Sequence, residues 1–363
     1  MRRNKADFYT QDGAGRQLRT LNHKPEKLLL RSGLETSGIL RVSTWHFLLS
    51  LPKNQTNRGN RPNTAFFAVG FMVESMRTQK MQREDRSMTN APKTVLAIHD
   101  LPGFGRAALS VIVPVLSTLG VQTVALPTAV LSTHTGGLGA PAKLANPGYG
   151  PAALEHYHRL GVKFDCIYSG YLADAAQAKL VEQAFELWPR AFKVVDPVLG
   201  DGGRLYSGLG ADMVPAMYSL CSKADLIVPN VTEAALLLGD PLPGVGSAEQ
   251  AAAQAARLTR VAPQVVVTGV TGIGGGRYIG CVGAARGGEG YTVKTPLLPR
   301  MFHGTGDIFA AVLVGRILQG NVPQAAVQAA AAFVSECIRQ TPEGTDERLG
   351  VWLEAALPKL MQQ

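Results

Sequence analysis

From Lys93 to the C-terminus, short runs of β-branched residues alternate with amphipathic stretches rich in Ala and Leu. This alternation is typical of βαβ units, in which successive strands lie parallel in one sheet. The run Val265–Val267 is apolar without interruption, as expected of a strand covered on both faces. The pattern therefore predicts an α/β fold with a mostly parallel, doubly wound central sheet, whose ligands bind beyond the carboxyl ends of its strands.

The expected elements follow from the period of the apolar residues. The strands, ending in a hairpin, are predicted at Thr94–His99, Val121–Pro127, Asp165–Ser169, Phe192–Asp196, Asp225–Val228, Gln264–Thr268, Tyr278–Ala284 and Gly290–Thr295. The helices are predicted at 106–119, 175–188, 232–238, 248–260, 306–319, 323–339 and 346–357.

Residues 1–90 differ from the rest of the chain. They hold 16 Lys and Arg against 7 Asp and Glu, whereas residues 91–363 hold 20 of each. The segment has no sustained periodicity and resembles neither a signal peptide nor a transit peptide. We expect a disordered extension, or upstream sequence translated from an early start codon, followed by one folded domain at 91–363.

Several classes of protein are excluded at this stage. Because the folded part carries no net charge, binding of nucleic acid is not expected to be its task. The four cysteines are far apart and form no CxxC pair, so neither a zinc ribbon nor a disulfide framework is indicated. No run of 18 apolar residues predicts a membrane span. A cytoplasmic globular protein is expected.

A candidate phosphate-binding device stands at His303–Asp307, directly before an apolar helix. The small residues Gly304, Thr305 and Gly306 let backbone N–H groups converge on an anion at the positive end of that helix. Asp307, in the first helical turn, is suited to act as a general base. An ordinary helix start with an acidic first turn is the alternative. The chain has no Gly-Lys dipeptide, which excludes a P-loop, and Gly272–Arg277 is interpreted as a hairpin turn.

Other polar residues follow predicted strands. Asp196 and Asp201 follow one strand, Asn230 and Glu233 follow the next, and Thr268 ends a third. Asn230 and Glu233 have a spacing that can face a phosphate-bound Mg²⁺ through waters, although the same spacing forms a capping box. All of these residues fall where an open α/β sheet binds ligands.

With these residues in view, the chain from about Lys93 onward resembles the pyridoxal kinase family of the ribokinase-like fold, a three-layer α/β/α sandwich. Six motifs in family order carry the resemblance: Ala97–Arg106, Leu131–Gly137, Tyr168–Leu172, Asp196–Asp201, Pro229–Glu233 and His303–Asp307. Residues 1–90 have no counterpart in it.

The resemblance implies an ATP-dependent kinase that phosphorylates the 5′-hydroxymethyl group of vitamin B6 vitamers. It implies that Asp307 is the catalytic base and that the N–H groups of Gly304, Thr305 and Gly306 form the anion hole. Asp196 and Glu233 would bind Mg²⁺, with Asn230, Thr268 and the shielding loop from Asp201 to Tyr206 around the ATP phosphates. A monovalent cation such as K⁺ and a homodimer are also implied.

The resemblance also implies a pyridine pocket formed by Asp100, His134, Thr135 and Tyr171. Better-known pyridoxal kinases commonly carry Ser where Asp100 stands, which leaves the preferred vitamer open. For His134 and Thr135 the alternative is a structural turn whose side chains are satisfied by the backbone.

Three rival functions share parts of this pattern. Hydroxymethylpyrimidine kinases share the fold, but they often have a cysteine at the position of Asp307. Sugar and nucleoside kinases generally add a lid of strands, for which little room exists between Thr94 and Asp165. A non-catalytic B6-binding protein is expected to have lost at least one of the acid, anion-hole or metal positions, all of which are present.

Overall fold

The computed structural model describes residues 91–206, 208–210, 212–242 and 246–362, together with residues 10–11 and 17–18. The chain divides into two units, Met1–Arg77 and Thr78–Gln363. In the first unit, β1 (Thr10–Gln11) pairs with β2 (Gln17–Leu18) in antiparallel fashion. Apart from these two strands, residues 1–90 lie outside the described residues, so their predicted disorder and the division near residue 90 stay predictions.

The second unit is built on a sheet whose described strands have the order β13-β12-β11-β10-β7-β6-β3-β4-β5. Neighbouring strands from β11 to β4 are parallel, whereas β12 and β13 at one edge and β5 at the other run antiparallel to their neighbours. The bounds are β3 Thr94–Phe104, β4 Gln122–Thr133, β5 Lys143–Leu144, β6 Cys166–Ser169, β7 Phe192–Val195, β10 Leu226–Ile227, β11 Gln264–Ile273, β12 Tyr278–Ala285 and β13 Tyr291–Pro296. The predicted mostly parallel sheet is confirmed.

Alternate residues of the central strands enter two hydrophobic cores, because successive side chains of a strand point to opposite faces. In β3, Val95 and Ala97 belong to one core, and Leu96 and Ile98 belong to the other.

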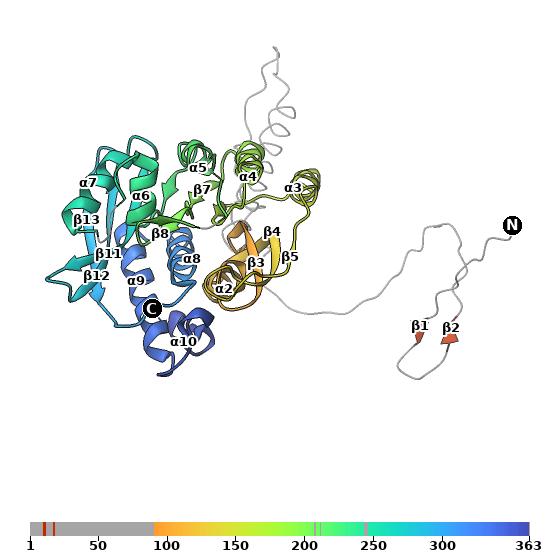
Figure 1. Ribbon diagram of the computed structural model, residues 1–363. Helices are drawn as coiled ribbons and strands as arrows, with labels where there is room; N and C mark the ends of the chain where they lie inside the picture. Colours follow the sequence, from red (N-terminus) through yellow and green to blue (C-terminus); the bar gives the residue numbers. More distant parts are fainter. Residues whose placement is uncertain are drawn as a thin grey trace, which may run out of the picture. The chain divides into compact units, whose positions relative to one another are not determined.

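Helices cover both faces of the sheet (Figure 1). On one face lie α2 (Leu109–Thr118), α8 (Thr305–Leu318), α9 (Pro323–Gln340) and α10 (Leu353–Leu360). On the other face lie α3 (Tyr149–Arg159), α4 (Ala175–Leu187), α5 (Met213–Cys221), α6 (Val231–Leu238) and α7 (Ala248–Leu258). The predicted three-layer α/β/α sandwich is confirmed. Within the described ranges, no helix has both the length and the apolar content of a bilayer span.

Two helix predictions are wrong in part, and two helices were not predicted. The helix predicted at 346–357 is interrupted, because Gly350 has φ 79° and separates a 3-10 turn, η1 (Glu347–Leu349), from α10. The helix predicted from residue 106 begins only at Leu109, because Ala108 has φ 48°. Helices α3 and α5 were not predicted, because Pro151 and Pro215 in their first turns hide the periodic pattern, although a first turn tolerates proline.

Candidate active site

Asp307 lies in the first turn of α8, at the carboxyl ends of the parallel strands. Its Oδ2 accepts a hydrogen bond from the backbone N–H of Ala108 at 2.9 Å. Burial raises the pKa of Asp307 to about 6, and the Ala108 N–H opposes the rise. A carboxylate with a pKa near neutrality can exchange protons at physiological pH, which a general base requires.

The start of α8 forms a cradle for an anion. Gly304 is the N-cap residue with φ 79°, and no side chain caps the helix there. The first N–H groups of a helix have no partner within the helix, so those after Gly304 are free to bind an anion. The Thr305 hydroxyl is turned to the carbonyl of Phe302 at 3.1 Å, which leaves the cradle to backbone groups.

No residue with a side chain can be accommodated at position 304 without a shift of the backbone. A Cβ there would stand 2.0 Å from the carbonyl oxygen of Arg106, and the positive φ is one that side-chain-bearing residues rarely adopt. The loop after β3 and the loop before α8 therefore touch backbone to backbone.

Two further carboxylates are buried at the ends of neighbouring strands. Asp196, 8% exposed, directly follows β7, and Glu233, 3% exposed, lies in the first turn of α6. Burial raises the pKa of Asp196, and the charge of Asp307 adds to the rise. Burial also raises the pKa of Glu233, and the charge of Asp196 adds to it. A cation between these acids would relieve both the repulsion and the cost of burial.

The residues present fit a Mg²⁺ ion that keeps part of its water shell. In the part of the chain that the structure describes, no three His, Cys, Asp or Glu side chains gather closely enough to hold a metal by themselves. Mg²⁺ is commonly bound by one or two carboxylates together with waters and substrate phosphates, so Asp196 and Glu233 are a sufficient protein contribution.

The capping box that the sequence offered as an alternative is confirmed. The side-chain Oδ1 of Asn230 accepts from the N–H groups of Thr232 and Glu233 at 2.9 Å, and Glu233 Oε2 accepts from the N–H of Asn230 at 2.8 Å. Glu233 Oε1 also accepts from the N–H of Leu199 at 3.1 Å. Glu233 therefore ties two strand ends together, and any contact with Mg²⁺ would use its remaining lone pairs.

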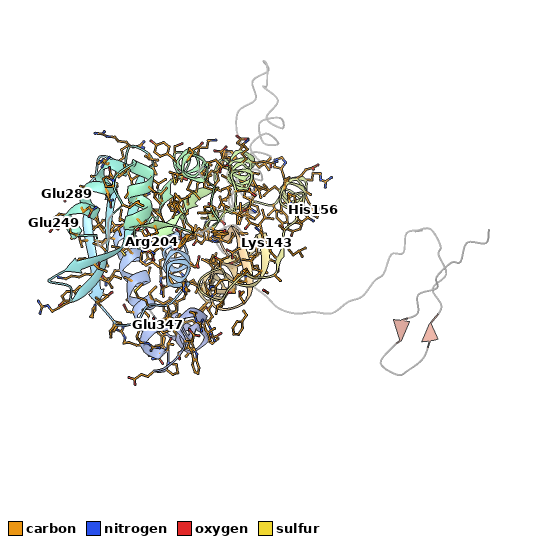
Figure 2. The ribbon with its side chains drawn as sticks, in the orientation of Figure 1. Lys143, His156, Arg204, Glu249, Glu289 and Glu347 are labelled. Carbon is orange, nitrogen blue, oxygen red and sulfur yellow. The ribbon has the colours of Figure 1, made fainter. Side chains whose placement is uncertain are left out.

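The predicted shielding loop is a small hairpin of β8 (Gly200–Asp201) and β9 (Arg204–Leu205), and Figure 2 labels Arg204 on it. The hairpin is fastened to α6, since the N–H of Gly203 donates to the Thr232 hydroxyl at 3.0 Å. Tyr206, at the end of the hairpin, is 42% exposed, and partial burial together with Glu233, Asp201, Asp196 and Asp307 raises its pKa.

Asn230 and Thr268 are neighbours across two strand ends. The Asn230 amide donates to the carbonyl of Gly200 at 2.8 Å, and Thr268 pairs with Asn230 in a parallel bridge. Both residues thus lie at the carboxyl ends of the central strands, as Asp196 and Glu233 do.

Asp100 lies 6% exposed at an irregular point of β3, between His99 and Leu101. Burial raises its pKa to about 7, the charge of Asp307 adds to the rise, and Lys143 opposes it. The pKa of Tyr171 is raised by burial and then by Asp100. Asp100 therefore lies within electrostatic range of both Tyr171 and Lys143, the first residue of β5, which Figure 2 labels.

His134 matches the structural alternative that the sequence left open. Its Nδ1 accepts from the N–H of Gly136 at 3.0 Å, and its Nε2 bonds the carbonyl of Arg348 at 2.6 Å. Both ring nitrogens are engaged by the backbone, so a contact with substrate would use the face of the ring. Thr135, next to it, is exposed.

The 3-10 turn η1, where Figure 2 labels Glu347, joins three loops of the site. The Arg348 carbonyl bonds His134 in the loop after β4. The Glu347 carbonyl accepts from the N–H of His303 before α8 at 3.4 Å, and the Leu349 carbonyl accepts from the N–H of Arg106 after β3 at 3.1 Å. The sequence did not predict the contacts of this turn, nor those of Ala108 and of Lys143. The contacts of η1 and Ala108 run through backbone atoms, which leave no side-chain motif to find.

Solved structures define the class of the protein. A pyridoxal kinase from Lactobacillus plantarum is 34% identical, with a TM-score of 0.68 over 74% of this chain and 97% of its own. A Bacteroides thetaiotaomicron protein assigned as a phosphomethylpyrimidine kinase, crystallised with pyridoxal, is 35% identical, with a TM-score of 0.70 over 74% of this chain and 96% of its own. The chain is a kinase of the ribokinase-like fold.

More closely, the chain belongs to the phosphomethylpyrimidine kinase family, whose family model matches residues 117–351, more than half of the chain. Curated relatives include pyridoxal kinases. That of Deinococcus radiodurans is 29% identical over 252 residues, 64% of this chain and 82% of the relative. That of Rubrobacter xylanophilus is 29% identical over 263 residues, 68% of this chain and 87% of the relative. The predicted resemblance to pyridoxal kinases is confirmed.

Proposed function

We propose that this chain uses ATP to phosphorylate the 5′-hydroxymethyl group of vitamin B6 vitamers, which are pyridoxal, pyridoxamine and pyridoxine. The observation that carries the proposal is the position of Asp307, a carboxylate of raised pKa beside the open N–H groups of α8. The curated relatives that are pyridoxal kinases, and the Bacteroides protein crystallised with pyridoxal, support this choice of substrate.

In the proposed mechanism, Asp307 accepts the proton of the attacking hydroxyl group. The N–H groups at 304–306 stabilise negative charge on the phosphoryl oxygens, without a covalent intermediate on the enzyme. ATP with Mg²⁺ supplies the phosphoryl group, and the ion neutralises part of its charge. Asp196 and Glu233 would hold the ion, with Asn230 and Thr268 near the phosphates.

The remaining site residues have proposed roles in exclusion and recognition. The hairpin from Asp201 to Tyr206 would keep water from the phosphoryl group. Asp100 and Tyr171 would contact the pyridine ring and its substituents, with His134 and Thr135 at the pocket rim. A homodimer and a K⁺ requirement stay predictions from the resemblance.

The test is an assay of ATP consumption by the full chain with pyridoxal, pyridoxamine, pyridoxine and hydroxymethylpyrimidine. We expect turnover of at least one B6 vitamer, and loss of that turnover in Asp307→Asn. If the folded protein binds ATP but turns over none of the three vitamers, the proposal is wrong.

Hydroxymethylpyrimidine kinase is the second candidate, because the matching family model has the description phosphomethylpyrimidine kinase. The same assay separates the two functions by the ratio of kcat/KM for the two alcohols. A non-catalytic B6-binding protein would instead bind a vitamer and consume no ATP.

We predict that kcat falls as the pH drops below about 6. The folded pKa of Asp307 is raised from 3.8 to about 6, so the base becomes protonated, and inactive, at a higher pH than an exposed aspartate would. The check is a profile of kcat against pH at saturating substrates. A kcat that stays constant down to pH 5 would contradict the assignment.

We predict that Asp196→Asn raises the Mg²⁺ concentration needed for half-maximal turnover by roughly tenfold or more. The melting temperature should not fall, because burial and Asp307 already disfavour the charged form of Asp196. Glu233→Gln should also raise the Mg²⁺ requirement, but it loses an acceptor of the capping box and about 1 kcal/mol of stability. An unchanged Mg²⁺ titration in both variants would remove these residues from the metal site.

A further inference from the structure

The backbone of Ala108 has a conformation that residues with a side chain rarely adopt. Its φ is 48° and its ψ −135°, and among the described residues it is the one non-glycine with φ in the left-handed range. Such a conformation costs stability and persists only where the surroundings impose it. It directs the N–H of Ala108 to Asp307, while the Ala108 carbonyl accepts the first hydrogen bonds of α2.

The loop at 105–108 is held in place from several sides. The Ser110 hydroxyl accepts from the N–H of Ala107 at 3.2 Å and lies 2.7 Å from the carbonyl of Ala107 and 3.3 Å from that of Gly105. In the described part of the chain, Ser110 and Asp307 are the side chains that bond the backbone of this loop. Ser110 therefore sets the turn from which the N–H of Ala108 projects.

We propose that Ser110 is a positioning residue for the catalytic base, because it fixes the turn that aims the Ala108 N–H at Asp307. With Oδ2 held by this N–H, the carboxylate cannot rotate freely, and Oδ1 is presented to the proton of the substrate hydroxyl group. This inference rests on the proposed role of Asp307. Ser110 bonds the backbone of the loop and not the substrate, so its removal should slow the chemical step and leave binding unchanged.

The experiment compares Ser110→Ala with Ser117→Ala, an exposed serine on the same helix, in the full chain. For Ser110→Ala we expect kcat to fall about tenfold, the rate equivalent of one hydrogen bond, with KM for MgATP and pyridoxal within about twofold of the original. Ser117→Ala should match the unmodified protein. An unchanged kcat in Ser110→Ala, or an equal loss in both variants, would overturn the inference.

A double-mutant cycle tests whether Ser110 acts through the base. In the Asp307→Asn background, Ser110→Ala should have no further effect on residual turnover, because no carboxylate remains to be positioned. The same fractional loss in both backgrounds would mean that Ser110 acts elsewhere.

Ala108→Gly serves as a second variant in case Ser110→Ala does not fold. Glycine adopts the φ of 48° without strain, so the melting temperature should stay equal or rise, while kcat falls because the loop is freer. A kcat equal to that of the original protein would count against the proposal. If Ser110→Ala and Ala108→Gly are fully active while Asp307→Asn is inactive, only this inference fails; if Asp307→Asn is fully active, the base assignment fails first.

Discussion

Asp307→Asn should lower turnover by at least roughly 10²-fold, the loss typical of removing a general base. Asparagine has nearly the same shape and can still accept the hydrogen bond from Ala108, but it cannot take a proton at neutral pH. MgATP should therefore still bind, which calorimetry can measure beside the kinetic assay. Full turnover in the variant would contradict the role of Asp307.

The same substitution should make the fold more stable at neutral pH. Because the folded pKa of Asp307 is raised, its ionisation disfavours the folded state, fully above about pH 6 and not at all below the unfolded pKa near 3.8. The rise of this pKa from 3.8 to about 6 corresponds to a gain of up to about 3 kcal/mol at pH 7, which shrinks as the pH falls below about 6 and is lost below about pH 3.8. The matched control is Asp240→Asn, which removes a surface carboxylate paired with Arg257 and should leave turnover unchanged.

Among substitutions that add a single methyl group to this site, Gly304→Ala should cause the largest loss of stability and activity. It combines a left-handed φ of 79° with a Cβ placed 2.0 Å from the carbonyl oxygen of Arg106. We expect a loss of about 3 kcal/mol or more in the free energy of unfolding, and at least roughly 10²-fold in kcat for the protein that remains folded, because the anion cradle is displaced.

Gly320→Ala separates the two causes of that loss. Gly320 also has a positive φ, of 92°, but a Cβ there meets nothing within 4 Å. It should cost only about 1 kcal/mol and leave kcat unchanged. If urea denaturation gives the same loss for both variants, the contact between Gly304 and Arg106 is not the cause.

Much of the fold could be predicted from the sequence because its strands are apolar runs separated by amphipathic helices. The run Val265–Val267 does lie buried in β11. The acids of the site were found for a related reason, since residues that follow parallel strands meet at one edge of the sheet. Asp196 and Glu233 follow different strands, yet the charge of Asp196 adds to the raised pKa of Glu233.

What could not be predicted depends on backbone contacts between distant segments. Ala108, with its φ of 48°, is an ordinary alanine in the sequence, and its N–H donates to Asp307, which is 199 residues away along the chain. His134 looked like a substrate ligand because of its motif, but its ring nitrogens are occupied by backbone groups at 136 and 348. No local pattern records such a pairing.

The turn η1 has a consequence for the order in which the protein is assembled. Arg348, whose carbonyl bonds His134, is separated from it by 214 residues, and contacts of such separation form late because a long loop must first be closed. A chain emerging from the ribosome can pair its central strands well before η1 has been synthesised. Nascent or truncated chains would thus contain a folded sheet but an incomplete site. Phosphoryl transfer would begin only when the segment containing η1 docks.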